Sequence, residues 1–310
     1  MGEGYGKTIL FGEHFVVYGL PAIAAAIGAK TIAEVERVDK PGVELIDDRP
    51  QTPGYKKEKA KEQWESINRI LTFCGIDLHD KGVKISLGGD LVAASGIGAS
   101  AASCVALARA LNHEFNLGWS EEKINEAAYE GEKGYHGTPS GIDNTVATFG
   151  GVIWFQKRSG QAPNLIEKIK IKHPISIVIG NTGLTSSTSR VISDVRSLKE
   201  RNPERFEKIL QRFQNVVTAA RESLIKRDLR RIGELMNENQ SLLREIQVSC
   251  TELDELVETS LDNGAYGAKL TGTGRGGLMI ALTPSRQIQM NVATAIGEKG
   301  YTVWSTSIGV

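Results

Sequence analysis

The first third of the chain places short apolar runs between turns and polar stretches. Residues 8–11 and 22–27 are mostly continuous apolar runs, whereas residues 31–38 carry apolar side chains at alternating positions. Runs of this length and alternation predict strands. Residues 47–59 are polar and contain Pro50 and Pro53. This stretch therefore predicts an exposed loop.

Helical spacing appears first in residues 61–74, which predict a helix. A stronger apolar stripe at three- and four-residue spacing follows a glycine-rich segment, and it consists of Ala101, Cys104, Val105, Ala108, Leu111 and Phe115. Ser120 then has the character of an N-cap. We expect the helix that it opens to end near Glu132, because Gly131 and Gly134 weaken helical structure there.

The back of the chain combines several helical stripes with a few strands. Asn202 and Pro203 mark a helix start, since proline is tolerated at the first helical position. Strands are predicted at residues 152–155, 175–179, 278–282 and 301–304, and a short helix at residues 251–261. Composition shifts near Lys170. The pattern predicts an α+β protein of two domains, residues 1–170 and 171–310, with a cleft between them.

Composition narrows the range of partners. The chain has 310 residues and equal numbers of acidic and basic side chains, so its formal net charge is zero. This balance gives no electrostatic reason to expect nucleic acid or an anionic membrane as a partner. Three widely spaced cysteines without a CxxC pair argue against a disulfide framework or a zinc site. With no secretory leader pattern and no bilayer-length apolar run, we expect a soluble, cytoplasmic protein.

The segment Ser95-Gly-Ile-Gly-Ala-Ser100 directly precedes the strongest predicted helix. A helix N-terminus presents unpaired N–H groups and a partial positive charge, and small residues allow a polyphosphate to approach them. The segment is not a Walker A loop, because no Gly-Lys-Ser/Thr follows. Two interpretations stay open from these residues: a phosphate cradle, or a flexible loop before a helix.

Two carboxylates are candidates for catalysis and metal binding. Asp143 follows a turn rich in glycine and proline, and a carboxylate held by a rigid turn can act as a base for a hydroxyl. Glu132 lies eleven residues earlier, and Mg²⁺ prefers oxygen ligands of this kind. The structural alternative for a lone Asp in a turn is an Asx-turn or a helix cap.

Two further segments of the chain combine glycines with polar or charged residues. Residues 269–277 contain a dense run of glycines before a predicted strand, which suits either close approach to a ligand or a tight strand entry. Lys7 opens the first strand, and Glu13 and His14 follow that strand in a turn. Taken alone, these last three residues are typical of a solvated strand end and a polar turn.

Together the four segments, in this order, resemble the motifs of the GHMP kinase superfamily over nearly the whole chain. Gly-Lys-Thr-Ile-Leu-Phe-Gly-Glu-His-Phe-Val-Val-Tyr-Gly, residues 6–19, resembles the mevalonate kinase family within it, because galactokinases continue Gly-Glu-His with Thr-Asp. The turn His-Gly-Thr-Pro-Ser-Gly-Ile-Asp-Asn, residues 136–144, is also similar to that family's turn around its catalytic aspartate.

The resemblance implies a role for each matching residue. Asp143 would take the proton of the attacking hydroxyl, and Lys7 would stabilise the developing charge. Ser100 and Glu132 would hold Mg²⁺ on the nucleotide. The residues implied to bind ATP are Ser95, Gly96, Ile97, Gly98, Ala99, Ser100 and Ser103. The residues implied to position the substrate are Glu13, His14, Thr188, Gly272 and Thr273.

The chain departs from the family pattern in three places. The proline that usually precedes the phosphate loop is missing, and Val92 or Ala93 stands near its position. Ala99 replaces the first of two loop hydroxyls. Arg275 replaces a glycine in the last motif. We expect Arg275 to face solvent or to form a structural ion pair, with a cation at the ligand as the other alternative.

The activity implied is the ATP-dependent phosphorylation of the 5-hydroxyl of mevalonate in isoprenoid biosynthesis. The alternatives are another GHMP kinase, acting on phosphomevalonate or a different mevalonate hydroxyl, and a non-catalytic ligand-binding homologue. The presence of Lys7, Glu132 and Asp143 disfavours the last of these. The apolar helices of the back half leave room for a homodimer.

Overall fold

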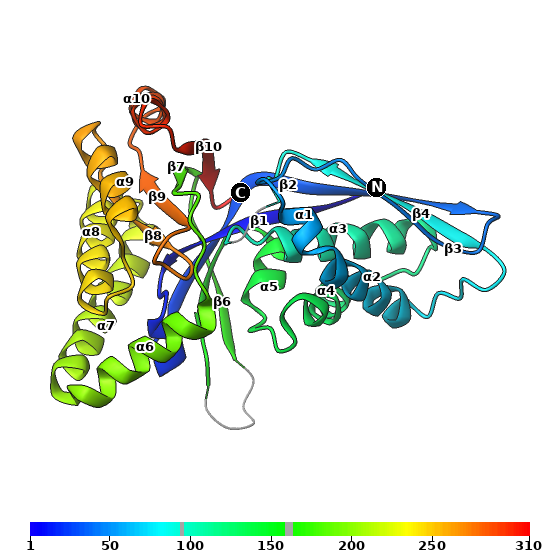
Figure 1. The fold of residues 1–310 in the computed structure, drawn as a ribbon, viewed down its shortest axis with the longest axis horizontal. Coiled ribbons are helices and arrows are strands. Elements are labelled where there is room, and N and C mark those ends of the chain that lie inside the picture. Colours follow the sequence, from blue (N-terminus) through cyan, green and yellow to red (C-terminus); the bar gives the residue numbers. More distant parts are fainter. Residues whose placement is uncertain (94–95, 159–163) are drawn as a thin grey trace. The chain divides into compact units, whose positions relative to one another are not determined.

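The computed structural model describes residues 1–93, 96–158 and 164–310, which form two compact units (Figure 1). Unit 1 comprises residues 1–7 and 26–150, and unit 2 comprises residues 8–25 and 151–310. Two strands, β1 (Gly2–Phe11) and β2 (Ala22–Val38), each contribute residues to both units. The boundary between two family domains at residue 170, which composition suggests, remains a prediction. The compact units are defined differently, because residues 8–25 belong to unit 2 together with residues 151–310.

Unit 1 packs helices against a small mixed sheet. Strand β4 (Gly82–Gly89) runs antiparallel to β2, from the pair Thr31–Gly89 onward, and parallel to β3 (Gly42–Asp47). The helices are α1 (Tyr55–Glu58), α2 (Ala60–Cys74), α3 (Ala99–Glu114), α4 (Glu121–His136) and α5 (Ile142–Phe149). Side chains from α2, α3, α4 and the strands share one buried apolar core. The predicted helices at residues 61–74 and after the glycine-rich segment are confirmed.

Helix α4 continues four residues beyond its predicted end, because its glycines are contact points. A Cβ on Gly134 would lie 2.5 Å from the backbone nitrogen of Ser66 in α2. A Cβ on Gly131 would lie 2.7 Å from the Ile70 side chain. The prediction that these glycines end the helix near Glu132 is therefore wrong: the close packing of α2 on α4 stabilises the final turn.

The polar stretch at residues 47–59 is mostly the exposed loop that its composition predicts, although residues 55–58 form helix α1 and Arg49 is buried. Arg49 is only 5% exposed, and it forms a two-pronged ion pair with Asp47, whose carboxylate also accepts a hydrogen bond from Gln63 at 2.9 Å. Gln51 forms a β-bridge with Ala93, immediately before the glycine-rich segment. Paired charges thus allow one arginine to be buried in a segment that is otherwise largely exposed.

Unit 2 contains an antiparallel sheet covered by helices. Its strands are β5 (Val152–Gln156), β6 (Leu165–Ile169), β7 (Ile175–Asn181), β8 (Gly267–Thr271), β9 (Leu278–Leu282) and β10 (Thr302–Ile308). Its longer helices are α6 (Thr188–Arg201), α7 (Pro203–Lys226), α8 (Leu229–Glu245), α9 (Thr251–Asp262) and α10 (Arg286–Glu298). Strands β8, β9, β7 and β10 pair antiparallel in that order. The strands predicted for this half are confirmed.

Local sequence explains several boundaries in unit 2. The Asn202 side chain accepts a hydrogen bond from the Arg205 N–H, so α7 begins where the Asn-Pro pair predicts. The edge of β8 is covered by α8, because Asn237 and Gln240 accept hydrogen bonds from the N–H groups of Ala268 and Leu270. Covering an edge in this way prevents it from pairing with another chain.

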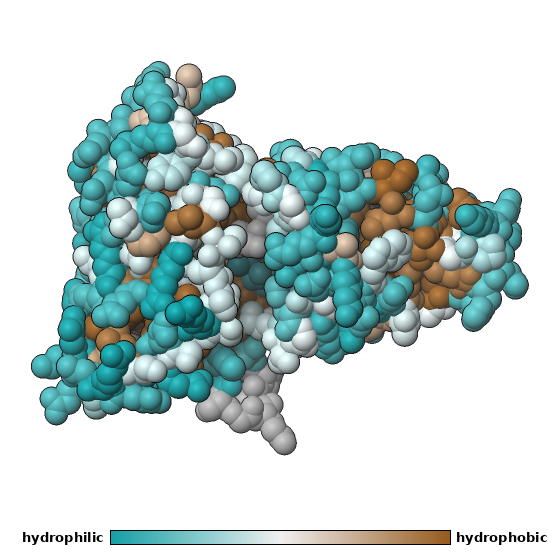
Figure 2. All heavy atoms as spheres, in the orientation of Figure 1, coloured by the Kyte–Doolittle hydropathy of each residue, from teal (hydrophilic) through white to brown (hydrophobic). Residues whose placement is uncertain are grey.

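The segment of residues 8–25 is anchored inside unit 2. Residues 22–25 of β2 pair antiparallel with β5, and the short 3₁₀ helix Phe15–Tyr18 buries the Phe15 ring against Phe213 of α7 with ring centroids 4.1 Å apart. In Figure 2, hydrophilic side chains cover most of the visible surface of the unit 2 helices. In the part of the chain that is described, none of the helices combines the length and apolarity that a membrane span needs.

Candidate active site

The glycine-rich segment meets Lys7 before α3 begins. The Lys7 N–H donates to the carbonyl of Ile97 at 2.8 Å, which fixes the loop beside strand β1. Gly98 has a left-handed φ of 70°, and a Cβ on it would lie 2.7 Å from the Lys7 side chain. Only glycine allows this close approach. Gly96 and Ala99 flank the turn, while the predicted nucleotide residue Ser95 lies outside the described residues.

Lys7 and Asp143 form an ion pair in unit 1. Their charged atoms lie 3.2 Å apart, and the lysine side chain is nearly buried while that of Asp143 is 29% exposed. Asp143 lies in the first turn of α5, where a helix dipole favours a carboxylate. The solvated-lysine alternative is therefore wrong. The arrangement leaves the carboxylate accessible and the cation beside it.

Glu132 of α4 is 1% exposed. Burial, with a smaller contribution from the charge of Asp143, raises the pKa of this carboxyl to about 8. A hydrogen bond from Ser100 and the charge of Lys7 act in the opposite direction. Its Oε1 atom has no hydrogen-bond partner among the described residues. A buried carboxylate oxygen without a partner indicates a missing cation or donor.

Ser100 and His136 complete this group in unit 1. The Ser100 hydroxyl lies 3.4 Å from His136 Nε2, which in turn lies 3.9 Å from a Glu132 carboxylate oxygen. An open cavity of about 220 Å³ is lined by Glu132, His136, residues 138–141 and Asp143. Two of the predicted residues, Glu132 and Asp143, thus line this cavity, while Lys7 pairs with Asp143 and Ser100 bonds to Glu132.

The donor set suits Mg²⁺ when phosphates supply the remaining ligands. Mg²⁺ in phosphotransfer sites is usually held by one or two carboxylates together with phosphate oxygens and waters. The unpartnered oxygen of Glu132 and the Ser100 hydroxyl are hard oxygen donors of this kind. Within residues 1–93, 96–158 and 164–310, no group of three His, Cys, Asp or Glu side chains could hold a metal by itself.

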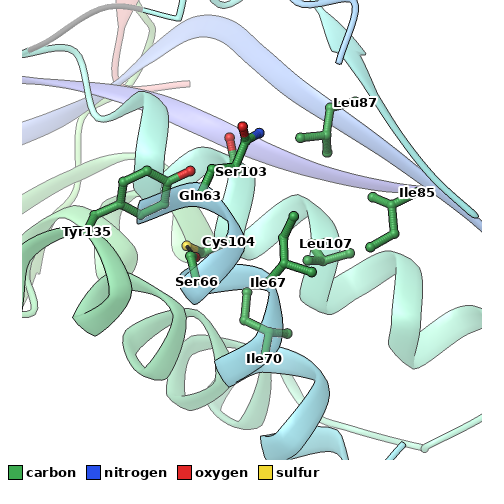
Figure 3. Close-up of a pocket in the computed structure, with 10 residues that line it drawn as sticks. All are labelled: Gln63, Ser66, Ile67, Ile70, Ile85, Leu87, Ser103, Cys104, Leu107 and Tyr135. Atoms are coloured by element: carbon green, nitrogen blue, oxygen red, sulfur yellow. Dashed lines mark hydrogen bonds between the residues drawn. The ribbon is translucent and has the colours of Figure 1, made fainter. Parts of the chain in front are cut away.

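A second cavity in unit 1 is a packing feature of its core. It encloses about 10 Å³ between α2, α3 and α4, which is room for one water at most. Figure 3 shows Gln63, Ser103 and Tyr135 at its polar end and Ile67 and Ile70 among the apolar lining. A cavity of this size cannot hold a substrate.

Ser103 has an internal role next to that cavity. Its hydroxyl donates to the carbonyl of Ala99 at 2.8 Å and accepts a hydrogen bond from the guanidinium of Arg49. Both contacts stabilise the first turns of α3. Contact of Ser103 with a nucleotide stays a prediction. The structure also shows that Arg49 supports the start of α3, which the polar composition of its segment does not indicate.

In unit 2, Glu13 forms a fully buried ion pair with Lys269. The two residues are 256 positions apart, and the lysine also donates to the carbonyl of Leu270. Burial lowers the pKa of Lys269, while Glu13 opposes that shift. The predicted substrate residue Glu13 therefore anchors the turn after β1 to strand β8. Nothing in the local sequence around Lys269 indicates this pairing.

His14 and Thr188 both contact the glycine-rich loop after β8. His14 Nε2 lies 2.7 Å from the carbonyl oxygen of Thr273, and since a carbonyl only accepts, Nε2 carries the proton and Nδ1 is left as an acceptor. Burial, helped by the charges of Arg275 and Lys269, lowers the pKa of His14 despite this hydrogen bond. The Thr188 and Thr273 hydroxyls lie 2.9 Å apart, and Gly272, directly before Thr273, is in the left-handed conformation. The predicted substrate residues are thus linked within unit 2.

Comparison with known proteins agrees with this geometry. The family model of the GHMP kinase N-terminal domain matches residues 63–151, and that of the C-terminal domain matches residues 220–302.

Whole-chain relatives are more specific. The mevalonate kinase of Thermococcus sibiricus is 35% identical over 309 residues, covering 94% of this chain and 90% of that protein, and the mevalonate kinase of Pyrococcus horikoshii matches equally well. The solved structure of L. major mevalonate kinase in complex with R-mevalonate superposes with a TM-score of 0.96 at 41% identity, covering 99% of this chain and 95% of that one. The chain belongs to the mevalonate kinase family of the GHMP kinases.

Proposed function

We propose that this protein transfers the γ-phosphoryl group of ATP to the 5-hydroxyl of mevalonate, giving 5-phosphomevalonate and ADP. The observation that carries the proposal is the Lys7–Asp143 ion pair beside the glycine-rich segment before α3. Such a pair supplies a base and a cation at the place where a hydroxyl would attack a bound phosphate. Membership of the mevalonate kinase family supports the choice of acceptor.

The chemistry needs positioning and charge stabilisation more than covalent catalysis. The Asp143 carboxylate takes the proton of the attacking hydroxyl while the oxygen bonds to the γ-phosphorus and the bond to ADP breaks. The Lys7 ammonium stabilises the negative charge on the transferred group. Backbone N–H groups of residues 96–100, at the start of α3, bind the phosphates.

Ser100 and Glu132 would hold Mg²⁺ together with the nucleotide phosphates. When bound, the metal neutralises charge on the β- and γ-phosphate oxygens. Ser100 is suited to this role because its hydroxyl is the remaining one of the loop's usual pair. Glu132 would offer its carboxylate to the metal from a buried position.

The acceptor is bound by polar side chains of residues 14, 188 and 273 in this proposal. His14 offers Nδ1 as an acceptor, and Thr188 and Thr273 offer hydroxyl groups held against each other. The buried Glu13–Lys269 pair keeps the His14 turn in place. The three free cysteines agree with a reducing, cytoplasmic location, which we propose as well.

A coupled assay of ADP release tests the proposal. Purified protein is given MgATP with mevalonate, phosphomevalonate or galactose, and we expect ADP release with mevalonate alone, with phosphate on the 5-oxygen by NMR. Release with phosphomevalonate or galactose but not mevalonate would contradict the acceptor assignment. ATP binding without ADP release on any of the alcohols would indicate a non-catalytic homologue.

A further inference from the structure

Arg275 occupies a backbone position that favours glycine. Its φ is 53°, in the left-handed region, and the adjacent Gly274 and Gly276 also have positive φ. A long side chain costs free energy in this conformation, whereas glycine does not. The contacts of the Arg275 side chain must therefore offset that cost.

Those contacts join three segments of unit 2. The guanidinium forms an ion pair with Asp194 of α6, which is one of the structural alternatives expected from the sequence. Its Nε donates to the carbonyl of Gln247 at 3.0 Å, and the Arg275 backbone N–H donates to Val248 at 2.8 Å. The loop after β8 is thereby tied to α6 and to the connection between α8 and α9. Because Asp194 neutralises the guanidinium, Arg275 is not a free cation for a phosphate.

The Asp194 contact is the second attachment of α6 to this loop. The first is at the start of the helix, where Thr188 contacts Thr273 and the Ser186 hydroxyl donates to Gly274 at 2.6 Å. Asp194 lies six residues further on, about 9 Å along the helix axis at 1.5 Å per residue. Two attachments at this spacing prevent α6 from pivoting about its first residue.

We propose that Arg275 is a positioning residue, which holds Thr188 and Thr273 in place for the phosphoryl acceptor through Asp194 and Gln247. The inference rests on the proposed function, since it assumes that these two threonines contact mevalonate. A surface ion pair by itself contributes little. Here the planar guanidinium makes two directed contacts at once, which a lysine cannot reproduce.

Steady-state kinetics of Arg275→Gln and Asp194→Asn test the proposal from both partners. We expect each to raise the KM for mevalonate about 3- to 10-fold, as for coupled neighbours, with kcat within about twofold and the KM for ATP unchanged. The KM for mevalonate of the double variant should be no higher than that of the more impaired single variant. Arg275→Lys should recover only part of the loss.

Arg275→Gly separates positioning from stability. It introduces the residue common in the family and removes the backbone cost, so we expect the melting temperature to be retained while the KM for mevalonate rises as in Arg275→Gln. The matched control is Arg212→Gln, which removes an exposed ion pair between α7 and α8 with Glu245. Its kinetics should equal those of the unaltered protein.

The outcomes separate the two proposals. The positioning role is wrong if the unaltered protein phosphorylates mevalonate but both Arg275→Gln and Arg275→Gly keep the unaltered KM for mevalonate. This holds even where the melting temperature falls. Strict additivity of Asp194→Asn and Arg275→Gln would also overturn it. If the unaltered protein releases no ADP with mevalonate, the proposed function itself fails.

Discussion

At the residue scale, the proposed catalytic pair Lys7 and Asp143 is an ion pair with charged atoms 3.2 Å apart. Lys7 is nearly buried, and a buried ammonium without a counter-ion is strongly unfavourable. Asp143 is the more exposed partner, which is why we propose it, and not Lys7, as the base. A substitution of either residue leaves the other without its partner. An informative variant must therefore keep the shape of the side chain while changing its charge.

Asp143→Asn keeps the size of the side chain and removes the base. We expect kcat to fall about 10²- to 10⁴-fold, the usual contribution of a general base, with the KM for ATP little changed. Circular dichroism and the melting temperature should show that the fold is intact. Turnover close to that of the unaltered protein would exclude Asp143 from the role.

Two serines of α3 offer a matched comparison. Ser100→Ala removes the hydroxyl that faces Glu132 and His136. Relative to the unaltered protein, we expect the KM for MgATP to rise more than the KM for mevalonate. Ser103→Ala removes a hydroxyl bonded inside the protein, so its main effect should be a lower melting temperature. Isothermal titration with MgATP distinguishes the two. A loss confined to mevalonate in Ser100→Ala would contradict metal binding by Ser100.

Sequence motifs identify the candidate site residues better than they identify the contacts that hold such residues in place. Lys7, Glu132 and Asp143 stand in motifs that resemble a known family. By contrast, the pairing of Lys269 with Glu13 joins positions 256 residues apart, and no local pattern encodes it. Only the folded chain brings such partners together.

At the element scale, the crossing of α2 and α4 depends on glycines that composition treats as helix breakers. Hydrophobic periodicity predicts the existence of both helices, and Ser120 predicts the start of α4. The end of α4 is decided by packing, because the close contact with α2 offsets the cost of glycine. Tertiary contact of this kind is not visible in a single sequence.

Gly134→Ala tests that packing. Its Cβ would clash with the Ser66 backbone, so we expect a loss of about 1–3 kcal/mol of unfolding free energy, as for overpacked cores. Gly88→Ala in β4 is the control, because no described atom lies within 4 Å of the added Cβ. Urea denaturation measures both. Equal stability of the two variants would show that the α2–α4 contact is looser than described.

The buried ion pair after β3 predicts acid sensitivity. Burial opposes the charge of Asp47, but hydrogen bonds and the charge of Arg49 lower its pKa to about 2, below its ordinary value near 3.8. The pair therefore stabilises the fold fully above pH 4, and the contribution of about 2 kcal/mol is lost as the pH falls towards 2.

Urea midpoints between pH 5 and pH 2 check this for Asp47→Asn. The variant should be less stable at pH 5 and should lose less stability on acidification than the unaltered protein. Asp39→Asn is the control, since the Asp39 side chain is fully exposed. Parallel acid dependence of the two variants would contradict the assignment.

At the scale of the whole molecule, the two compact units are not consecutive halves of the chain. Residues 8–25 complete unit 2 by pairing with β5 and by stacking Phe15 on Phe213. Composition can locate a change of character along the chain, near Lys170, but it cannot show that an early segment belongs with late ones. Strand pairing decides that point.

A fragment of residues 151–310 should therefore not fold by itself. It lacks the strand that pairs with β5 and exposes the apolar surface around Phe213, so we expect aggregation or loss of the cooperative melting transition. Phe15→Ala in the full chain removes only the ring contact, and we expect it to lower the free energy of unfolding by about 3–5 kcal/mol. A soluble fragment with a sharp melting transition would contradict this dependence.

The passage of β1 and β2 through both units also limits how relatives can be recombined. A chimaera that exchanges only residues 151–310 would bring a foreign α7 and β5 against the original residues 8–25. An exchange that also transfers residues 8–25 preserves the Phe15–Phe213 stack, the β2–β5 pairing and the Glu13–Lys269 pair as a set. Three crossover points, at residues 7/8, 25/26 and 150/151, are therefore the minimum for a hybrid that keeps native partners within each unit.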